Sequence, residues 1–231
     1  MRFSRIRLGT LLTACIFPLW IAPAFGATGL LCHVETAEKE VFASFLRNEY
    51  GISAREPLVI EDSTDRSHFA REFLLSDLVL RGLASALYPQ LRSAPKGSVT
   101  VFDSVPLGLF IPGGRTIGEL QDDYNKKLED SCQVDPLPYP SANVKLVSHS
   151  DLRRIFHRDD PADGWREFRN RFSEDAVLLS FSRVAFDKGR KVAMVHVSRA
   201  AGSMAAHGTL YLLRRDGKAW RIVSSYPTWT T

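Results

Sequence analysis

The sequence predicts an α+β fold, with a four-stranded antiparallel sheet packed by helices in the C-terminal half and a helix-rich α/β N-terminal half. Helical periodicity dominates the first half, whereas four apolar segments separated by turn signals fill residues 177–226. Helices followed by a run of strands favour this class, with the sheet covered on one face. Apolar residues make up 45% and charged residues 24% of the 231-residue chain, which is ordinary for a soluble globular protein.

The beginning of the chain has the pattern of a secretory signal peptide. Three arginines precede the uncharged run "LGTLLTACIFPLWIAPAF", and Ala24 and Gly26 are small residues of the kind that a signal peptidase recognises. We therefore expect residues 1–26 to be removed and the mature protein to be periplasmic or secreted, with no membrane span. Two alternatives stay open, because "LTAC" fits a lipoprotein cleavage box and an apolar run of about 18 residues approaches the length of a membrane anchor.

The net charge of the mature chain argues against a partner selected by bulk electrostatics. The whole chain carries +4, but residues 1–26 hold three arginines and no acidic residue, so cleavage leaves +1. The sequence has no basic stripe and no run of like charges. Nucleic acid is therefore not an expected partner. A protein partner or a small anionic ligand is expected instead.

The cysteines predict one disulfide. Cys15 leaves with the signal peptide, and the even pair Cys32 and Cys132 remains in an oxidising compartment. The pair lacks the C-x-x-C spacing of a redox or metal site. A Cys32–Cys132 bond would close a loop of about 100 residues, for which the chain-entropy model gives about 4.7 kcal/mol of stabilisation.

Residues 27–135 form the first predicted half, closed by the disulfide. Its first helix has Thr36 as a cap and stops at Gly51. Its last helix has the capping-box spacing of Thr116 and Glu119. The proline-rich segment "QVDPLPYPSA" then separates two halves or crosses within one continuous domain. Helices are expected at 36–51, 68–89 and 115–132, and strands at 57–62 and 98–105.

Residues 143–231 form the second predicted half. A strand at "NVKLVS" precedes a short helix capped by Ser150 and a second helix with three inward aromatic side chains. Four strands follow, with hairpin turns at Lys188-Gly189 and Asp216-Gly217. These strands are expected at 177–186, 191–198, 208–215 and 219–226.

The second half resembles a set of exported bacterial proteins. The resemblance rests on "GWREF", "LLSFSRVAF", "KVAMVHV", "GSMAAHGTLYLLRRDGKAWRIV" and the final "TW", in that order, and covers about the last half of the chain. This sequence departs from the pattern at Ala185, where glycine is usual, and in the loop that keeps only Gly202 and Gly208. The resemblance implies the fold and export, and it transfers no activity, cofactor or catalytic residue.

Motifs of established chemistry are missing from the sequence. It contains no G-x-S-x-G, H-E-x-x-H, P-loop or dinucleotide fingerprint, and its six histidines are scattered, so neither a cofactor nor a metal site is expected. The acidic turn from Glu61 to Asp65 follows a predicted strand. Its carboxylates are expected to cap the next helix, or to provide a catalytic group at Asp62 or Asp65.

Arg183 is a charged residue that the alternation places on an apolar strand face, with Leu179, Phe181 and Ala185. A buried guanidinium needs a carboxylate nearby. One hypothesis pairs Arg183 with Asp151, Glu167 or another helix carboxylate to hold helix and sheet together. The other makes Arg183 an anion-binding group at the mouth of a pocket, because its planar fork suits a carboxylate or phosphate.

The hairpin register decides which residues accompany Arg183. A tight turn at Lys188-Gly189 would place Met194 and His196 on the same face, so both are candidate ligand-binding residues with Arg183. A slip of one residue would place Ala193, Val195 and Val197 there instead.

Three functional hypotheses follow from these patterns. The first is a non-enzymatic exported module that binds a ligand or partner through its C-terminal half. The alternative is a cell-envelope hydrolase built on Asp62 or Asp65 and a histidine from elsewhere. A third is a surface interaction module, which predicts an exposed apolar patch around Tyr226, Trp229 and the 202–208 loop.

Overall fold

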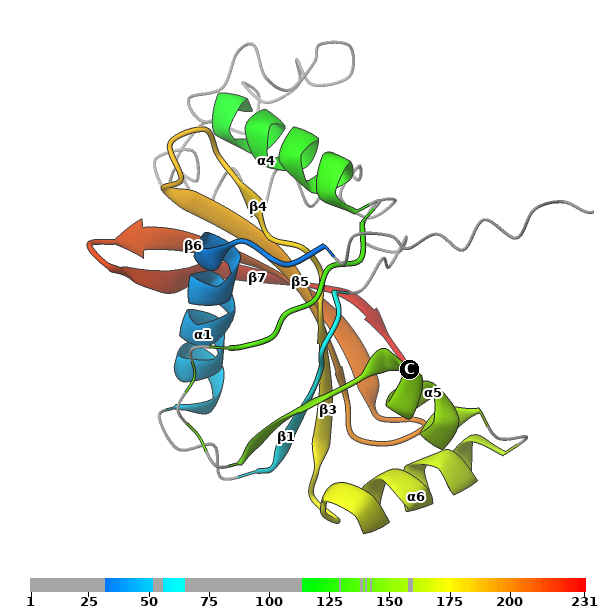
Figure 1. Cartoon of the computed structure of the whole chain (residues 1–231). Coiled ribbons are helices and arrows are strands. Elements are labelled where there is room, and N and C mark those ends of the chain that lie inside the picture. Colours follow the sequence, from blue (N-terminus) through cyan, green and yellow to red (C-terminus); the bar gives the residue numbers. More distant parts are fainter. Residues whose placement is uncertain are drawn as a thin grey trace, which may run out of the picture. The chain divides into compact units, whose positions relative to one another are not determined.

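The computed structural model (Figure 1) describes residues 32–51, 56–64, 114–128, 130–137, 139, 141, 143–157 and 160–231. The predicted signal peptide, the helix expected at 68–89 and the strand expected at 98–105 lie outside these residues. Within them the elements are α1 (Thr36–Tyr50), β1 (Leu58–Glu61), α4 (Gly114–Lys127), β2 (Val144–Val147), α5 (His149–Phe156), α6 (Pro161–Phe172), β3 (Val177–Phe181), β4 (Ala185–Phe186), β5 (Val192–Ala200), β6 (Ala206–Asp216) and β7 (Ala219–Thr230). The α+β class is confirmed.

The described strands form one seven-stranded sheet, which corrects the predicted four-stranded one. The order is β2-β1-β3-β5-β6-β7, with β4 paired to β5. Strands β2, β1 and β3 run parallel to one another, and all other pairs are antiparallel. The predicted strands at 57–62 and 143–148 are therefore β1 and β2, and they extend the C-terminal sheet. Their pairing is a long-range contact that the alternation along one strand does not encode.

Helix α1 covers one face of the sheet. Its aromatic side chains Phe42 and Phe45 pack on Phe181, with ring centroids 4.7 and 5.5 Å apart. The helix begins with a capping box of Glu35 and Glu38, one residue before the predicted cap at Thr36. It ends where predicted, at Gly51, whose φ of +74° suits a residue without a Cβ.

Helices α5 and α6 cover the opposite face, because Val59 packs with them whereas its neighbours Leu58 and Ile60 pack with α1. Trp165 and Phe168 of α6 are buried there, as predicted. The cap of α5 is Ser148 rather than Ser150, since its hydroxyl accepts a hydrogen bond from the Asp151 backbone N–H. The sheet thus has helices on both faces rather than one (Figure 1).

Helix α4 covers the edge of β4 that pairs with no other strand among the described residues (Figure 1). The carboxylates of Glu119 and Asp123 accept hydrogen bonds from the backbone N–H groups of Lys188 (3.1 Å) and Phe186 (2.8 Å). Lys127 Nζ donates to the Val184 carbonyl at 2.9 Å. Four residues of a helix rise about 6 Å and two residues of a strand about 6.8 Å. The spacing of Glu119 and Asp123 therefore matches that of the Phe186 and Lys188 N–H groups. Helix side chains therefore satisfy this edge in place of a strand.

The chain has one extra residue between β3 and β4. Phe181 pairs with Val197 and Ala185 with Met194, so four steps on one side oppose three on the other. Such a bulge re-aims side chains. As a result Phe181 faces the α1 core together with Val195 and Val197, which is the register that results from a slip of one residue in the predicted hairpin. Ala185 does not belong to that core.

Gly208 offers a test of packing on β6. The Trp229 indole lies on it, and a Cβ at position 208 would fall 2.1 Å from the indole Nε1. We expect Gly208→Ala to lower the free energy of unfolding by about 1–3 kcal/mol through overpacking. Gly118→Ala in α4 is the matched control, because a Cβ there meets no atom within 4 Å. It should stabilise the helix by up to about 1 kcal/mol. Urea denaturation of both variants checks the opposite signs.

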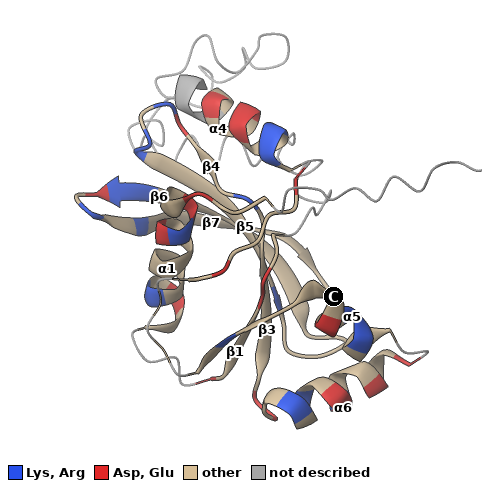
Figure 2. Cartoon of the chain, viewed as in Figure 1, with Lys and Arg blue, Asp and Glu red and all other residues tan. Residues whose placement is uncertain are grey.

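Within the described part of the chain, no helix is both long and apolar enough to span a membrane. Acidic and basic residues are interspersed on the described helices, and these helices carry no continuous patch of one charge (Figure 2).

Candidate functional site

Arg183 lies in a buried ion pair with Glu38 of α1. Its Nε and Nη2 donate to the two carboxylate oxygens of Glu38, each at 2.9 Å. The Glu38 side chain is 0% and the Arg183 side chain 8% exposed. The Glu38 oxygens also accept the backbone N–H groups of Glu35 (2.8 Å) and Val184 (2.9 Å). The buried carboxylate therefore accepts four hydrogen bonds, two from the Arg183 guanidinium and two from the backbone.

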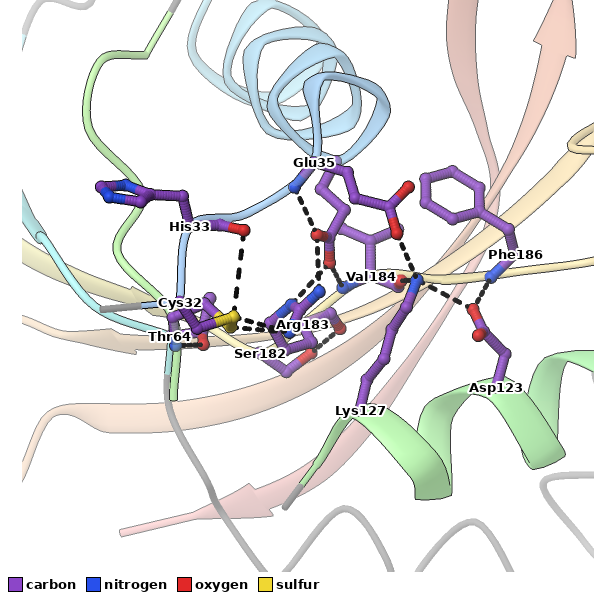
Figure 3. A network of polar contacts seen from close by, with 12 residues as sticks. Cys32, His33, Glu35, Thr64, Asp123, Lys127, Ser182, Arg183, Val184 and Phe186 are labelled. Atoms are coloured by element: carbon purple, nitrogen blue, oxygen red, sulfur yellow. Dashed lines mark hydrogen bonds and ion pairs between the residues drawn. A yellow bond between two sulfur atoms is a disulfide. The ribbon is translucent and has the colours of Figure 1, made fainter. Parts of the chain in front are cut away.

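The third side of the guanidinium faces the disulfide (Figure 3). Cys32 and Cys132 are bonded, as predicted. Arg183 Nη1 lies 2.7 Å from Cys132 Sγ and 3.7 Å from Cys32 Sγ. The disulfide joins the segment that precedes α1 to the segment that follows α4, where Val34 N–H bonds to the Gln133 carbonyl. One arginine thus connects α1, the sheet and the disulfide.

This geometry favours the structural hypothesis for Arg183. Its partner is a helix carboxylate, as this hypothesis predicts, but the residue is Glu38 of α1 and neither of the two named examples, Asp151 and Glu167. Asp151 instead accepts hydrogen bonds from Ser148 and Arg154, and Glu167 is exposed on α6. A bidentate pair with a buried carboxylate already uses the fork that an anionic ligand would occupy.

Met194 and His196 do not accompany Arg183. They occupy the face opposite the α1 core, because their neighbours Val195 and Val197 belong to that core. His196 Nε2 forms a 2.9 Å hydrogen bond with Thr228 Oγ1. Burial disfavours the imidazolium and lowers the pKa of His196 from 6.5 to about 4.

The depressed pKa of His196 predicts a loss of stability in acid. An unfolded histidine binds its proton below pH 6.5, whereas the folded one stays neutral down to about pH 4. The stabilising contribution is therefore complete above pH 6.5 and is lost as the pH falls toward 4, by about 3 kcal/mol in total. Between pH 6.5 and 4, the free energy of unfolding, measured by denaturation, should fall more steeply with decreasing pH for wild type than for His196→Gln. His157→Gln, at an exposed histidine, should keep the wild-type slope.

A second polar cluster lies at the carboxyl ends of β1 and β2. Glu61 is the last residue of β1, and His149 is the first residue of α5 after β2. His149 Nδ1 lies 2.5 Å from Glu61 Oε1, and Ser180 Oγ donates to Glu61 Oε2 at 2.8 Å. The Glu61 side chain is 14% and the His149 side chain 62% exposed. One partly buried carboxylate thus bridges a hydroxyl and an accessible imidazole.

The local sequence explains this cluster. Parallel strands end at one edge of a sheet, so β1 and β2 deliver Glu61 and His149 to the same place. Asp62 Oδ1 accepts the His149 backbone N–H at 3.2 Å and so caps α5, a helix distant in sequence, instead of the next helix along the chain. Asp65 lies outside the described residues.

The cluster continues across the sheet as a row of side chains on one face. Ser180 pairs with Ser198, Ser198 with Gly208, and Gly208 with Trp229. Directly paired residues point to the same side of a sheet. Ser180, Ser198 and Trp229 are half-buried. A carboxylate, two hydroxyls and an aromatic ring therefore share one face.

The predicted surface patch is represented by one residue. Met204, in the loop between β5 and β6, is 85% exposed, and it is the one large apolar side chain that is exposed among the described residues. Tyr226 and Trp229 are half-buried on β7. A single methionine does not form a contiguous patch of the size that marks an interface.

Sequence reasoning located the acidic turn but missed His149 and Ser180. Both reach Glu61 through the parallel pairing of β1 with β2 and β3, which the alternation does not predict. The available signal was that two short strands each end in polar residues, "ED" and "SH". Glu38 was also missed. It stands beside the apolar residues of the first predicted helix, and nothing in the sequence distinguishes it from the other acidic residues of that helix.

Comparison with known proteins found no matching family model, no matching curated protein and no matching solved structure. Within the described ranges, no group of three or more histidine, cysteine, aspartate or glutamate side chains is placed to hold a metal ion.

Proposed function

We propose that this chain is an exported protein that binds a small ligand at the Glu61–His149–Ser180 cluster. The observation that carries the proposal is the Glu61 carboxylate, which is partly buried at the carboxyl ends of parallel strands and bonds to both Ser180 and His149. Ligands of open α/β sheets bind at that edge. The disulfide supports an oxidising compartment.

The cluster favours an uncharged ligand rich in hydroxyl groups over an anionic one. A carboxylate accepts hydrogen bonds from hydroxyl donors but repels an anion, and the Arg183 fork is occupied by Glu38. Ser180 and Ser198 add hydroxyl groups along the same face, and Trp229 adds an aromatic surface. A saccharide fragment of the cell envelope has the matching chemistry.

The test is a thermal-shift and calorimetric screen of the oxidised mature chain against neutral cell-envelope saccharides. We expect one class to raise the melting temperature, and Glu61→Gln to weaken its binding by about tenfold or more, since hydrogen bonds to charged groups contribute about 1.5–3 kcal/mol. Glu49→Gln is the control, because Glu49 is exposed on α1. Equal binding by wild type and Glu61→Gln would remove the cluster as the site.

A hydrolase is the second candidate, and the Glu61–His149 contact favours it. A carboxylate on Nδ1 fixes the imidazole tautomer and leaves Nε2 to take a proton from water. We expect His149→Gln to reduce hydrolysis of chromogenic esters or glycosides by about 100-fold or more. His157→Gln, at an exposed histidine outside the cluster, should retain full activity. If wild type hydrolyses no substrate class faster than buffer does, the hydrolase candidate fails and ligand binding remains as the proposed function.

A further inference from the structure

We propose that the Cys32–Cys132 disulfide is a site of thiol–disulfide exchange, at which a small-molecule thiol attacks Cys32 and Arg183 stabilises Cys132 as the leaving thiolate. This role is separate from the Glu61 cluster. It arises from the contacts of the guanidinium with both sulfur atoms.

The two sulfurs differ in access and in surroundings. Cys32 is partly exposed, whereas Cys132 is 1% exposed. Arg183 Nη1 is also closer to Cys132, at 2.7 Å against 3.7 Å. Cys32 is therefore the more accessible residue of the two for an incoming thiolate, and the sulfur that departs when it is attacked is the one beside the cation. Attack in this direction places the developing charge where it is stabilised.

The donor inventory of Arg183 fits the thiolate better than the disulfide. Nε and Nη2 are used by Glu38, and Nη1 is directed at sulfur. A disulfide sulfur is a weak acceptor, so these N–H groups gain little from it, but a thiolate is a charged and much stronger one. Glu38 does not cancel this effect completely, because its charge is shared with two backbone N–H donors. A cation beside a cysteine lowers the thiol pKa and makes it a better leaving group.

The chemical step is a simple exchange. The thiolate of the small molecule forms a bond to Cys32 Sγ while the Sγ–Sγ bond breaks, and the electron pair leaves on Cys132 Sγ. The product is a mixed disulfide on Cys32 and a thiolate on Cys132 that accepts hydrogen bonds from Arg183. The thiolate of a second molecule then attacks the sulfur of the first, the bond to Cys32 Sγ breaks with its electron pair on Cys32, and the two small molecules leave joined as a disulfide.

Glutathione reacting with the oxidised mature chain under native conditions tests the proposal. We expect peptide mass mapping to find glutathione on Cys32 and not on Cys132. The comparison variant is Glu38→Gln with Arg183→Met, which removes both charges together and leaves no orphan ion. Its exchange rate should be about tenfold lower than that of wild type, even though it is less stable.

The sign of this change separates the proposal from a structural role. If Arg183 only holds the fold together, the variant opens more often and its disulfide reacts faster. Arg190→Met is the matched control, because it removes an exposed guanidinium that is paired with Glu35 instead of Glu38, and it should leave the rate unchanged. In Cys32→Ala, the alkylation of Cys132 by iodoacetamide should have its pH midpoint well below the ordinary pKa of a thiol. A faster variant, glutathione on Cys132, or an ordinary pH midpoint for Cys132 would each overturn the proposal.

Discussion

Replacing Glu38 by alanine should destabilise the protein by about 3–5 kcal/mol, because it leaves the Arg183 guanidinium buried without its carboxylate. The pair is bidentate and nearly excluded from solvent. The same change removes the acceptor of two backbone N–H groups, those of Glu35 and Val184. Since a typical domain is stable by about 5–15 kcal/mol, a loss of this size approaches global unfolding. Urea denaturation at neutral pH measures it.

Glu40→Ala is the control for this prediction. Glu40 lies on the same helix and forms an ion pair with Arg215, but at 3.7 Å and with 44% of its side chain exposed. An exposed pair of this kind contributes about 0–1 kcal/mol. Glu38→Gln with Arg183→Met should recover part of the loss, because neither charge remains buried alone. Equal effects of Glu38→Ala and Glu40→Ala would show that the pair does not hold α1 on the sheet.

The predicted fold was most accurate where one element carries its own signal. The stripe of apolar residues and the glycine at position 51 located α1, and the alternation with Asp216-Gly217 located β6 and β7. Pairing between distant segments was not predictable in this way. Strand β1 has buried residues at its first three positions, so nothing in its pattern tells which strands flank it. The sheet therefore has more strands than expected.

The site was predictable to a similar limit. Alternation identified Arg183 as a buried charge that needs a carboxylate, and that requirement is met. It could not select Glu38, because alternation along one strand does not tell which helix covers that face of the sheet. The bulge between β3 and β4 explains why Met194 and His196 point away from Arg183. One extra residue exchanges the two faces to which the side chains of a strand point. The turn signal at Lys188-Gly189 gives no sign of that extra residue.

Removing the disulfide with Cys32→Ala and Cys132→Ala should cost about 2–5 kcal/mol of stability. The bond joins residues 100 positions apart, a separation for which the chain-entropy model gives about 4.7 kcal/mol. It also fixes the segment that precedes α1 against residues 132–134, where Gln133 N–H bonds to the Cys32 carbonyl at 2.7 Å. Urea denaturation of the oxidised protein and the double variant measures the difference. A loss below about 1 kcal/mol would mean that the unfolded chain is already constrained without the bond.

A double-mutant cycle then connects the disulfide with the buried ion pair. The two alanines remove the sulfur atoms that Arg183 Nη1 contacts, so the cost of Glu38→Gln with Arg183→Met should differ between the two backgrounds. Because a disulfide sulfur is a weak acceptor, we expect this coupling to be small in the oxidised protein, about 0.5 kcal/mol. In protein with both cysteines reduced, the thiolate of Cys132 replaces that weak acceptor, and the coupling should grow. A coupling that is equal in the oxidised and reduced states would place the whole contribution of Arg183 in its pair with Glu38.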